Sequence, residues 1–186
     1  MGLRIIGGDL KGKKLHSVRG PLIRPTADRL RESIFDILFL RVQGAIVLDL
    51  FAGSGALGIE ALSRGAASAV FIDKHQSALS VIERNIRSCV FDDRTKIIQW
   101  NILKNLNCIK LTRPAFDLVF MYPPYHRDSI KPALFNLHRS GSLAKEACII
   151  IEHTPSEPVP KDYVEFEIVD QRRYGKTIIS FLNYMV

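Results

Sequence analysis

The residues best suited to chemistry lie in two short stretches, one rich in glycine and one rich in proline. The first is Asp49-Leu50-Phe51-Ala52-Gly53-Ser54-Gly55-Ala56-Leu57-Gly58, whose glycines let the backbone approach a ligand closely. The second is Tyr122-Pro123-Pro124-Tyr125, where the prolines fix the backbone and Tyr125 offers a flat face for stacking a base. Together they predict a site for a nucleoside-containing cofactor and a planar substrate.

Two further polar residues follow predicted strands. Asp73 stands 20 residues after Gly53, and its carboxylate could accept hydrogen bonds from both hydroxyls of a ribose. Asn101 follows the next strand along the chain. Its amide oxygen could accept a hydrogen bond from an adenine amine, or the residue could simply form a turn.

The choice of cofactor depends on Asp49. Gly53 to Gly58 spells the dinucleotide fingerprint G-x-G-x-x-G, and Asp73 has the offset expected for a nicotinamide cofactor. An acidic side chain just before a pyrophosphate site would repel it, whereas it would attract the amino group of a methionine moiety. S-adenosylmethionine has that amino group and no phosphate, so the sequence favours it, with a nicotinamide dinucleotide as the alternative.

The elements that position these residues alternate between strand and helix. Apolar runs predict strands at 46–50, 69–73, 96–100, 116–121 and 148–152, with helices at 56–63, 75–88 and 129–138. This alternation is typical of βαβ units, which form a parallel sheet with helices on both faces. Segments 163–169 and 177–184 predict an antiparallel hairpin at the edge of the sheet. In such α/β folds, ligands bind beyond the carboxyl ends of the strands, where both chemical stretches lie.

The first 31 residues form a basic arm. Eight of the chain's 26 lysines and arginines lie here against two aspartates, and the net charge of the whole chain is +7. Segments 4–7 and 13–18 predict a β-hairpin, and Thr26 is placed to cap a following helix. The arm is either an element that binds a polyanion or a solvated surface that favours solubility.

Length and composition exclude several other classes of protein. With 186 residues, of which 47% are hydrophobic, the chain predicts one domain whose core needs neither a disulfide nor a metal. The three cysteines lack the spacing of a zinc site or a redox couple, and the five histidines, expected mainly at the surface, lack metal-ligand spacing. No apolar run could cross a bilayer and no signal peptide is evident. We therefore expect a cytoplasmic protein with no membrane contact and no metal.

Taken together, these motifs resemble class I S-adenosylmethionine-dependent methyltransferases. Within that class they resemble the bacterial RsmD type, which methylates the exocyclic amine (N2) of a guanine in small-subunit (16S) ribosomal RNA. The resemblance spans almost the whole chain. Its segments are Arg4-Ile5-Ile6-Gly7-Gly8 with Lys11-Gly12, Arg24-Pro25-Thr26 with Asp28-Arg29 and Arg31-Glu32, Leu48 to Gly58, Ser63-Arg64-Gly65-Ala66, and Tyr174-Gly175-Lys176-Thr177.

The resemblance implies a Rossmann-like class I methyltransferase fold with a mostly parallel seven-stranded sheet. A single domain would span residues 1–186, with a basic hairpin extension over 1–24 and a catalytic α/β core over 25–186. The implied donor is S-adenosylmethionine, with S-adenosylhomocysteine as the product. The implied partner is ribosomal RNA or the small ribosomal subunit, and the implied state is a monomer.

The resemblance also assigns roles to individual residues. Around the donor, Asp49, Gly53 and Gly55 would surround the methionine part, Asp73 the ribose and Asn101 the adenine. The remaining predicted cofactor contacts are Phe51, Ser54, Lys74 and Ile102. The predicted RNA contacts are Arg4, Lys11, Lys13, Lys14, Arg24, Arg29 and Arg31. Arg29 could alternatively help to hold the carboxylate of the donor.

Tyr122 departs from the family pattern, in which an Asp or Asn directly before two prolines accepts one N–H of the target amine. The carbonyl of the first proline accepts the other, so Tyr122, Pro123, Pro124 and Tyr125 are the predicted catalytic residues. A phenol oxygen can accept one hydrogen bond, but it lies farther from the backbone and also donates. Three consequences stay open: slower turnover, a shifted loop in which Pro123 does most of the orienting, or an inactive RNA-binding or assembly factor on the same fold.

Overall fold

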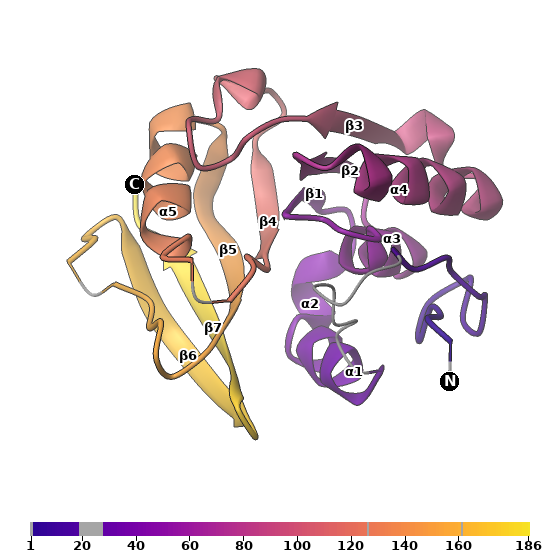
Figure 1. Cartoon of the computed structure of the whole chain (residues 1–186), viewed down its shortest axis with the longest axis horizontal. Coiled ribbons are helices and arrows are strands. Elements are labelled where there is room, and N and C mark those ends of the chain that lie inside the picture. The colour runs from indigo at the N-terminus through magenta and orange to yellow at the C-terminus, as the bar shows by residue number, and fades with distance from the viewer. Residues whose placement is uncertain (1, 19–27, 126, 161) are drawn as a thin grey trace.

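A seven-stranded sheet forms the middle of the molecule (Figure 1). The computed structural model describes residues 2–18, 28–125, 127–160 and 162–186. The strands are β1 (Ile46–Leu50), β2 (Ser68–Asp73), β3 (Thr95–Gln99), β4 (Phe116–Met121), β5 (Leu143–His153), β6 (Phe166–Tyr174) and β7 (Thr177–Tyr184). The helices are α1 (Asp28–Ile37), α2 (Phe39–Val42), α3 (Ala56–Ser63), α4 (Gln76–Cys89) and α5 (Ile130–Ser140), with short 3-10 turns at Asp92–Arg94 and Asn107–Ile109.

The strand order is β3-β2-β1-β4-β5-β7-β6. Strands β1 to β5 pair in parallel, whereas β7 runs antiparallel to both β5 and β6. The predicted mostly parallel sheet and its terminal antiparallel hairpin are therefore confirmed. Because β1 connects toward β2 on one side while β4 lies on its other side, the strand order reverses between β1 and β4. A crevice beyond the carboxyl ends of these strands is the usual ligand site in such sheets.

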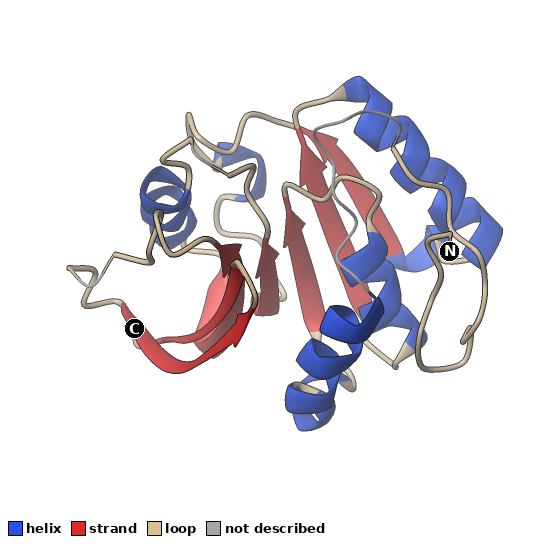
Figure 2. Cartoon of the chain, turned by 60° about the horizontal axis from the view of Figure 1, so that its bottom comes forward, coloured by secondary structure: helices blue, strands red, loops and turns tan. Residues whose placement is uncertain are grey.

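Helices lie on opposite faces of the sheet (Figure 2). Alternate residues of the central strands pack in two cores, one on each face. Val47 and Phe120 belong to a core with residues of α1, α3 and α4. Leu48 and Met121 belong to a second core with residues of α5 and of the loop after β3. Strand β1 has no exposed side chain because both of its faces are covered, as its uninterrupted apolar run predicts.

The predicted N-terminal hairpin is only partly formed. In place of two full strands there is an isolated antiparallel bridge between Arg4 and Lys14, flanked by backbone hydrogen bonds from Ile5 to Lys13 and from Leu15 to Leu3, both at 2.9 Å. The backbone does not continue a ladder because nearby donors turn toward helix α3. The N–H of Ile6, for example, donates to a carboxylate oxygen of Glu60 at 2.8 Å. The boundary predicted between residues 24 and 25 lies outside the described residues.

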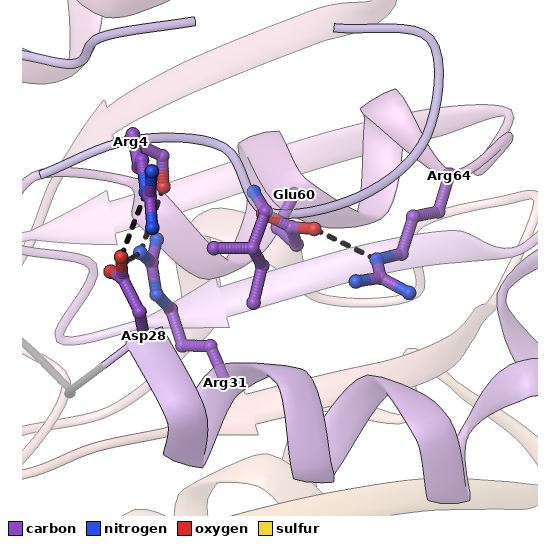
Figure 3. Close-up of polar contacts among 6 residues, drawn as sticks. Arg4, Asp28, Arg31, Glu60 and Arg64 are labelled. Atoms are coloured by element: carbon purple, nitrogen blue, oxygen red, sulfur yellow. Dashed lines mark hydrogen bonds and ion pairs between the residues drawn. The ribbon is translucent and has the colours of Figure 1, made fainter. Parts of the chain in front are cut away.

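Glu60 holds the arm against α3 from inside the protein (Figure 3). Its side chain is 0% exposed, and its second carboxylate oxygen accepts a hydrogen bond from Nε of Arg64 at 2.8 Å. The Arg64 guanidinium in turn lies over the ring of Phe35, 4.9 Å from the centroid. A buried carboxylate is tolerated here because both of its oxygens are hydrogen-bonded and its charge is balanced.

Ser63 and Asn85 complete the docking of the arm. The Ser63 hydroxyl donates to the carbonyl of Gly7 at 2.8 Å and accepts from the N–H of Leu10 at 3.0 Å. On α4, Asn85 accepts from the N–H of His16 at 2.7 Å and donates to its carbonyl at 2.9 Å. These bonds fix the basic arm on the two helices that follow β1 and β2.

We expect Glu60→Gln to lower the free energy of unfolding by about 2 kcal/mol, because a buried charge-assisted pair is lost. The new amide keeps a single acceptor oxygen, so either Ile6 N–H or Arg64 faces an NH2 group. Urea denaturation measures the change. Glu83→Gln is the matched control, since Glu83 pairs with Arg87 on the exposed side of α4, and it should cost less than about 0.5 kcal/mol. Equal losses in the two variants would refute the docking role of Glu60.

Candidate active site

The glycine-rich stretch turns from β1 into α3 through residues with left-handed backbone conformation. Phe51 has φ of 57°, Gly53 of 57° and Gly55 of 74°. A left-handed conformation is uncommon for a phenylalanine, and residues held in such conformations concentrate at functional sites. The sharp turn leaves the end of β1 and the start of α3 facing the crevice.

Asp49 lies buried beneath this turn with 2% of its surface exposed. Its Oδ2 atom accepts the N–H of Gly58 at 3.0 Å. A Cβ atom at Gly58 would lie 2.4 Å from the ring of Phe71 and 3.2 Å from the Asp49 carboxylate. The third glycine of the motif is therefore required by close packing between α3 and the sheet.

Burial dominates the ionisation of Asp49. Burial, together with the smaller effect of the negative charge of Asp73, raises the pKa of this carboxyl to about 8 against the lowering effect of the Gly58 hydrogen bond. At neutral pH the carboxyl is therefore mostly protonated while no cation lies beside it. A ligand with an amino group would reverse this, because an adjacent positive charge favours the carboxylate.

Asp73 connects the end of β2 to the glycine turn. Its Oδ2 accepts the N–H of Gly53 at 3.0 Å, and its Oδ1 accepts the N–H of His75 at 2.9 Å. Each carboxylate oxygen can accept more than one hydrogen bond, so both stay available to hydroxyl donors. Two residues predicted to contact the cofactor are thus joined directly.

A hollow of about 330 Å³ lies beyond the ends of β2 and β3. It is lined by Lys74, Gln99, Trp100, Asn101, Lys104 and Asn105. The amide oxygen of Asn101 accepts the N–H of Leu103 at 3.1 Å, so this residue forms a turn as well as lining the hollow. A larger hollow of about 520 Å³ lies between the basic arm and α4, and its described lining includes none of the predicted site residues.

Ile102, predicted to contact the cofactor, places its side chain in the core. Its side chain is 3% exposed and belongs to the core on the α5 face of the sheet. Its carbonyl accepts a hydrogen bond from Nδ2 of Asn136 at 2.8 Å. The prediction followed from its position after β3, but the chain turns there and directs this residue into the core.

Tyr122 comes directly after β4, beside the end of β1. Its hydroxyl is buried and has no hydrogen-bond partner within the described part of the chain. Burial raises the pKa of the phenol well above its usual value, and the charges of Glu152 and Asp49 raise it further while Arg31 lowers it. The phenol is therefore neutral, and its hydroxyl keeps its capacity to donate and to accept a hydrogen bond.

The rest of the proline stretch is anchored to the neighbouring strands. Pro123 is buried and Pro124 exposed. The hydroxyl of Tyr125 donates to the Glu152 carboxylate near the end of β5 and lies 3.4 Å from Oγ1 of Thr177 at the start of β7. The sequence analysis missed Glu152, although its place at the end of a predicted strand is the signal that identified Asp73.

The predicted RNA contacts differ in exposure. Arg4, Lys11, Lys14 and Arg29 are exposed and Lys13 is half-buried. Arg24 lies outside the described residues. These exposed cations are suited to a polyanion, although a solvated surface would show the same exposure.

Arg31 corrects the predicted RNA surface. Its side chain is 0% exposed, so it cannot reach a phosphate at the surface. Its Nη2 atom donates to the carbonyl of Arg4 at 2.8 Å and to Oδ1 of Asp28 at 2.9 Å (Figure 3). Arg31 is buried because it precedes Ile34 by three residues and shares the face of α1 that packs on the core.

Other kinds of site find no support in the residues that the structure describes. There, no three His, Cys, Asp or Glu side chains are grouped as metal ligands. The cysteines are free, and burial raises the pKa of each thiol, that of Cys148 to about 11, which makes them poor nucleophiles. None of the described helices combines the length and apolar character needed to span a bilayer.

Comparison with known proteins agrees with this geometry. A family described as Conserved hypothetical protein 95 matches residues 3–183. Ribosomal RNA small subunit methyltransferase D of Escherichia coli (strain K12) is 35% identical over 158 residues, which cover 85% of this chain and 78% of that protein. The chain belongs to this methyltransferase family. The family resemblance inferred from the sequence motifs is thus confirmed.

Solved structures show the same fold as this family member. A hypothetical protein of Thermus thermophilus, TTHA0928, is 29% identical with a TM-score of 0.79, covering 98% of this chain and 99% of that one. The protein SMU.776, solved as a complex with SAH, has a TM-score of 0.67 at 15% identity and covers 87% of this chain and 50% of that one. The second likeness is one of fold alone.

Gly58→Ala is expected to lower the free energy of unfolding by about 1–3 kcal/mol, because the added methyl group overlaps the ring of Phe71. Thermal or urea unfolding measures the loss. Combining it with Phe71→Leu, which removes that ring, should cost less than the sum of the two single changes, by on the order of 1 kcal/mol. If the losses in unfolding free energy of the two single variants simply add in the double variant, contact with Phe71 is not the reason that position 58 requires glycine.

Proposed function

We propose that this protein transfers a methyl group from S-adenosylmethionine to the N2 amine of a guanine in small-subunit (16S) ribosomal RNA. The observation that carries the proposal is that β1 and β4 pair in parallel, which brings Tyr122 and the buried Asp49 to the same end of the sheet. The name of the Escherichia coli relative supports the substrate class. The fold shared with a structure that holds SAH supports the donor.

The residues at the sheet edge fit the three parts of S-adenosylmethionine. Asp49 is buried without a cationic partner among the described residues, so its carboxylate would hold the amino group. Asp73 has lone pairs left for the two ribose hydroxyls. The hollow beside Lys74 and Asn101 would take the adenine. A dinucleotide is disfavoured because two acidic side chains flank the turn where its pyrophosphate would lie.

When bound, the donor supplies a methyl group already activated by its sulfonium. The task of the chain is therefore to hold the guanine amine in line with that group. The neutral hydroxyl of Tyr122 would accept one N–H of the amine, and the carbonyl of Pro123 would accept the other. Tyr125, fixed at its hydroxyl by Glu152, would stack on the base.

The alternative of an inactive RNA-binding or assembly factor is not favoured. Such a factor needs the basic arm but has no use for a buried carboxyl below a glycine turn. Asp49 and Asp73, each of which accepts a hydrogen bond from a glycine of the motif, support the interpretation as a donor site. The strained backbone at Phe51 has no role in RNA binding by the arm.

The test is transfer of a labelled methyl group from S-adenosylmethionine to small ribosomal subunits that lack the guanine N2 modification. The label should map to N2 of a guanine by nuclease digestion and mass spectrometry, and fully modified subunits should accept none. A folded protein that binds the donor but labels no guanine would overturn the proposed substrate. A protein that does not bind the donor would overturn the proposed reaction.

Tyr122→Phe isolates the role of the unpaired hydroxyl. The turnover number should fall about 10- to 100-fold, because one hydrogen bond to the amine, worth roughly 1–3 kcal/mol, is lost. Stability should stay within about 0.5 kcal/mol, since the hydroxyl has no partner in the described protein. Tyr163→Phe, at a half-buried tyrosine whose hydroxyl makes a long 3.4 Å bond to the Lys131 carbonyl, should change neither quantity appreciably. Wild-type turnover in Tyr122→Phe would assign the orientation of the amine to Pro123 alone.

Donor affinity should rise with pH as Asp49 ionises. Because burial holds its pKa at about 8, the carboxyl is protonated at low pH and must lose its proton to bind a cationic amine. Calorimetry with S-adenosylhomocysteine should therefore show about a tenfold gain in affinity from pH 6 to pH 7, about fivefold from pH 7 to pH 8, and at most about twofold above pH 8. Asp49→Asn should bind weakly and lose this slope. An unchanged slope in the variant would assign it to another group.

A further inference from the structure

The turn between β6 and β7 carries a cluster of exposed cations. Arg172, Arg173 and Lys176 are all exposed, and we call these three residues the basic turn. The Nε atom of Arg172 pairs with a carboxylate oxygen of Asp170 at 2.8 Å, and Nε of Arg173 donates to the carbonyl of Gly175 at 3.0 Å. The Nη groups of both arginines and the ammonium group of Lys176 bond to none of the described residues. These groups are therefore available to an external anion.

The topology of the sheet places the basic turn at the edge that carries the candidate active site. Strand β7 runs antiparallel to both β5 and β6, so β6 ends at the same edge of the sheet as β5. Ile179 of β7 pairs with Glu152 on one side and with Arg172 on the other. Because residues directly opposite each other in a ladder share a face of the sheet, Arg172 and Glu152 lie in one row on one face.

Two contacts hold the turn beside the proline stretch and α1. Oγ1 of Thr177, the first residue of β7, lies 3.4 Å from the hydroxyl of Tyr125, the residue proposed to stack on the base. On the other strand, the hydroxyl of Tyr174 lies 2.6 Å from Oγ of Ser33 on α1. Tyr174 and Thr177 are themselves paired across the turn. The cations are therefore carried by a turn that is anchored next to Tyr125.

The basic arm lies on the other side of α1. Figure 1 shows the arm, near the N-terminus, and the β6–β7 hairpin on opposite sides of this helix, and Figure 2 shows them apart from a second direction. Arg4 of the arm pairs with Asp28 of α1 at 2.9 Å, while Tyr174 of the hairpin contacts Ser33 of the same helix. A nucleic-acid strand that presents a base to the site would therefore meet cations on both sides of that base.

We propose that the basic turn binds the phosphate backbone of the ribosomal RNA beside the target guanine, on the side of the site away from the arm. The inference rests on the proposed function. An enzyme that modifies a base takes it out of the stack, and phosphate contacts hold the strand in register while it does so. Arg172 and Arg173 each offer a forked guanidinium to a phosphate, and Lys176 offers a point charge.

The position and sign of these charges favour RNA over a solvated surface or an acidic protein. A solvated surface mixes charges of both signs, whereas residues 170–176 hold three cations against the single acidic Asp170. Cations next to an aromatic ring are the arrangement with which proteins hold single-stranded nucleic acid, and Tyr125 supplies that ring. An acidic protein surface would use the cations but not the ring.

The test measures how binding depends on salt concentration, with protein-free 16S rRNA and with small subunits that lack the guanine N2 modification. Arg172→Gln, Arg173→Gln and Lys176→Gln are combined in one full-length variant. Its dissociation constant should rise about 10- to 100-fold, and the slope of log K against log salt should fall by about two to three, because up to three phosphate contacts are lost. In the methyl-transfer assay, KM for the subunits should rise more than the turnover number falls.

A variant with the same change in net charge provides the matched control. Lys110, Arg139 and Lys145 are also exposed, but they lie near the end of α5 and the start of β5, away from the carboxyl ends of the strands. Their joint replacement by glutamine should weaken binding less than about threefold.

Two further measurements keep the result independent of folding. Calorimetry should show that every variant binds S-adenosylhomocysteine as the wild type does. Lys176→Gln alone removes a side chain that bonds to none of the described residues, and it should lower the salt slope by about one. This single variant decides the matter if the triple variant is unstable.

The outcomes separate the inference from the proposed function. A wild type that binds S-adenosylhomocysteine but neither rRNA nor subunits overturns the proposed substrate, and the inference with it. Wild-type affinity and salt slope in the triple variant overturn the inference alone. An equal loss in the control variant does the same, because it shows an effect of net charge. Weakening confined to whole subunits, with unchanged or absent binding to protein-free rRNA, would assign the turn to a ribosomal protein and likewise overturn the inference.

Discussion

Parallel strands end at a common edge, and the candidate active site depends on this geometry. Asp49 lies near the end of β1, Asp73 ends β2, Tyr122 follows β4 and Glu152 lies near the end of β5. Because β1 lies between β2 and β4, its glycine turn separates the residues assigned to the donor from those assigned to the base. Residues more than 100 positions apart in the chain thus meet without any long loop to carry them.

Several features that destabilise a folded protein lie at this same edge of the sheet. Phe51 has a left-handed backbone, the Tyr122 hydroxyl lacks a partner among the described residues, and Asp49 is buried with an elevated pKa. Each of these features costs folding free energy, and the packed cores on both faces of the sheet offset that cost. Such a concentration of local conflicts in an otherwise consistent fold is characteristic of a functional site.

The sequence predicted the elements better than the tertiary contacts. The bounds of β1, β4 and α3 match those predicted because apolar runs and glycines act locally. The sequence did not reveal that the predicted hairpin of the arm forms only in part. Its backbone N–H groups at Ile6 and His16 bond to the side chains of Glu60 and Asn85, which lie 54 and 69 positions away. Arg31 and His153 were expected at the surface from their residue types. Both are buried, because tertiary packing decides which side of a helix or strand faces the core. Nε2 of His153 lies 2.7 Å from Oγ of Ser180.

The basic arm is not a detachable module. A Cβ atom at Gly8 would lie 1.8 Å from the carbonyl oxygen of Ser63, so the arm fits only the surface that α3 presents. The same helix begins at the glycine turn, and Asn85, which holds the arm at His16, also donates to the carbonyl of Ser54 within that turn. An arm moved onto another methyltransferase would lack the surface of α3 against which it packs. A change in the path of the arm would therefore disturb the packing of α3 and, through Asn85, the glycine turn at the start of this helix.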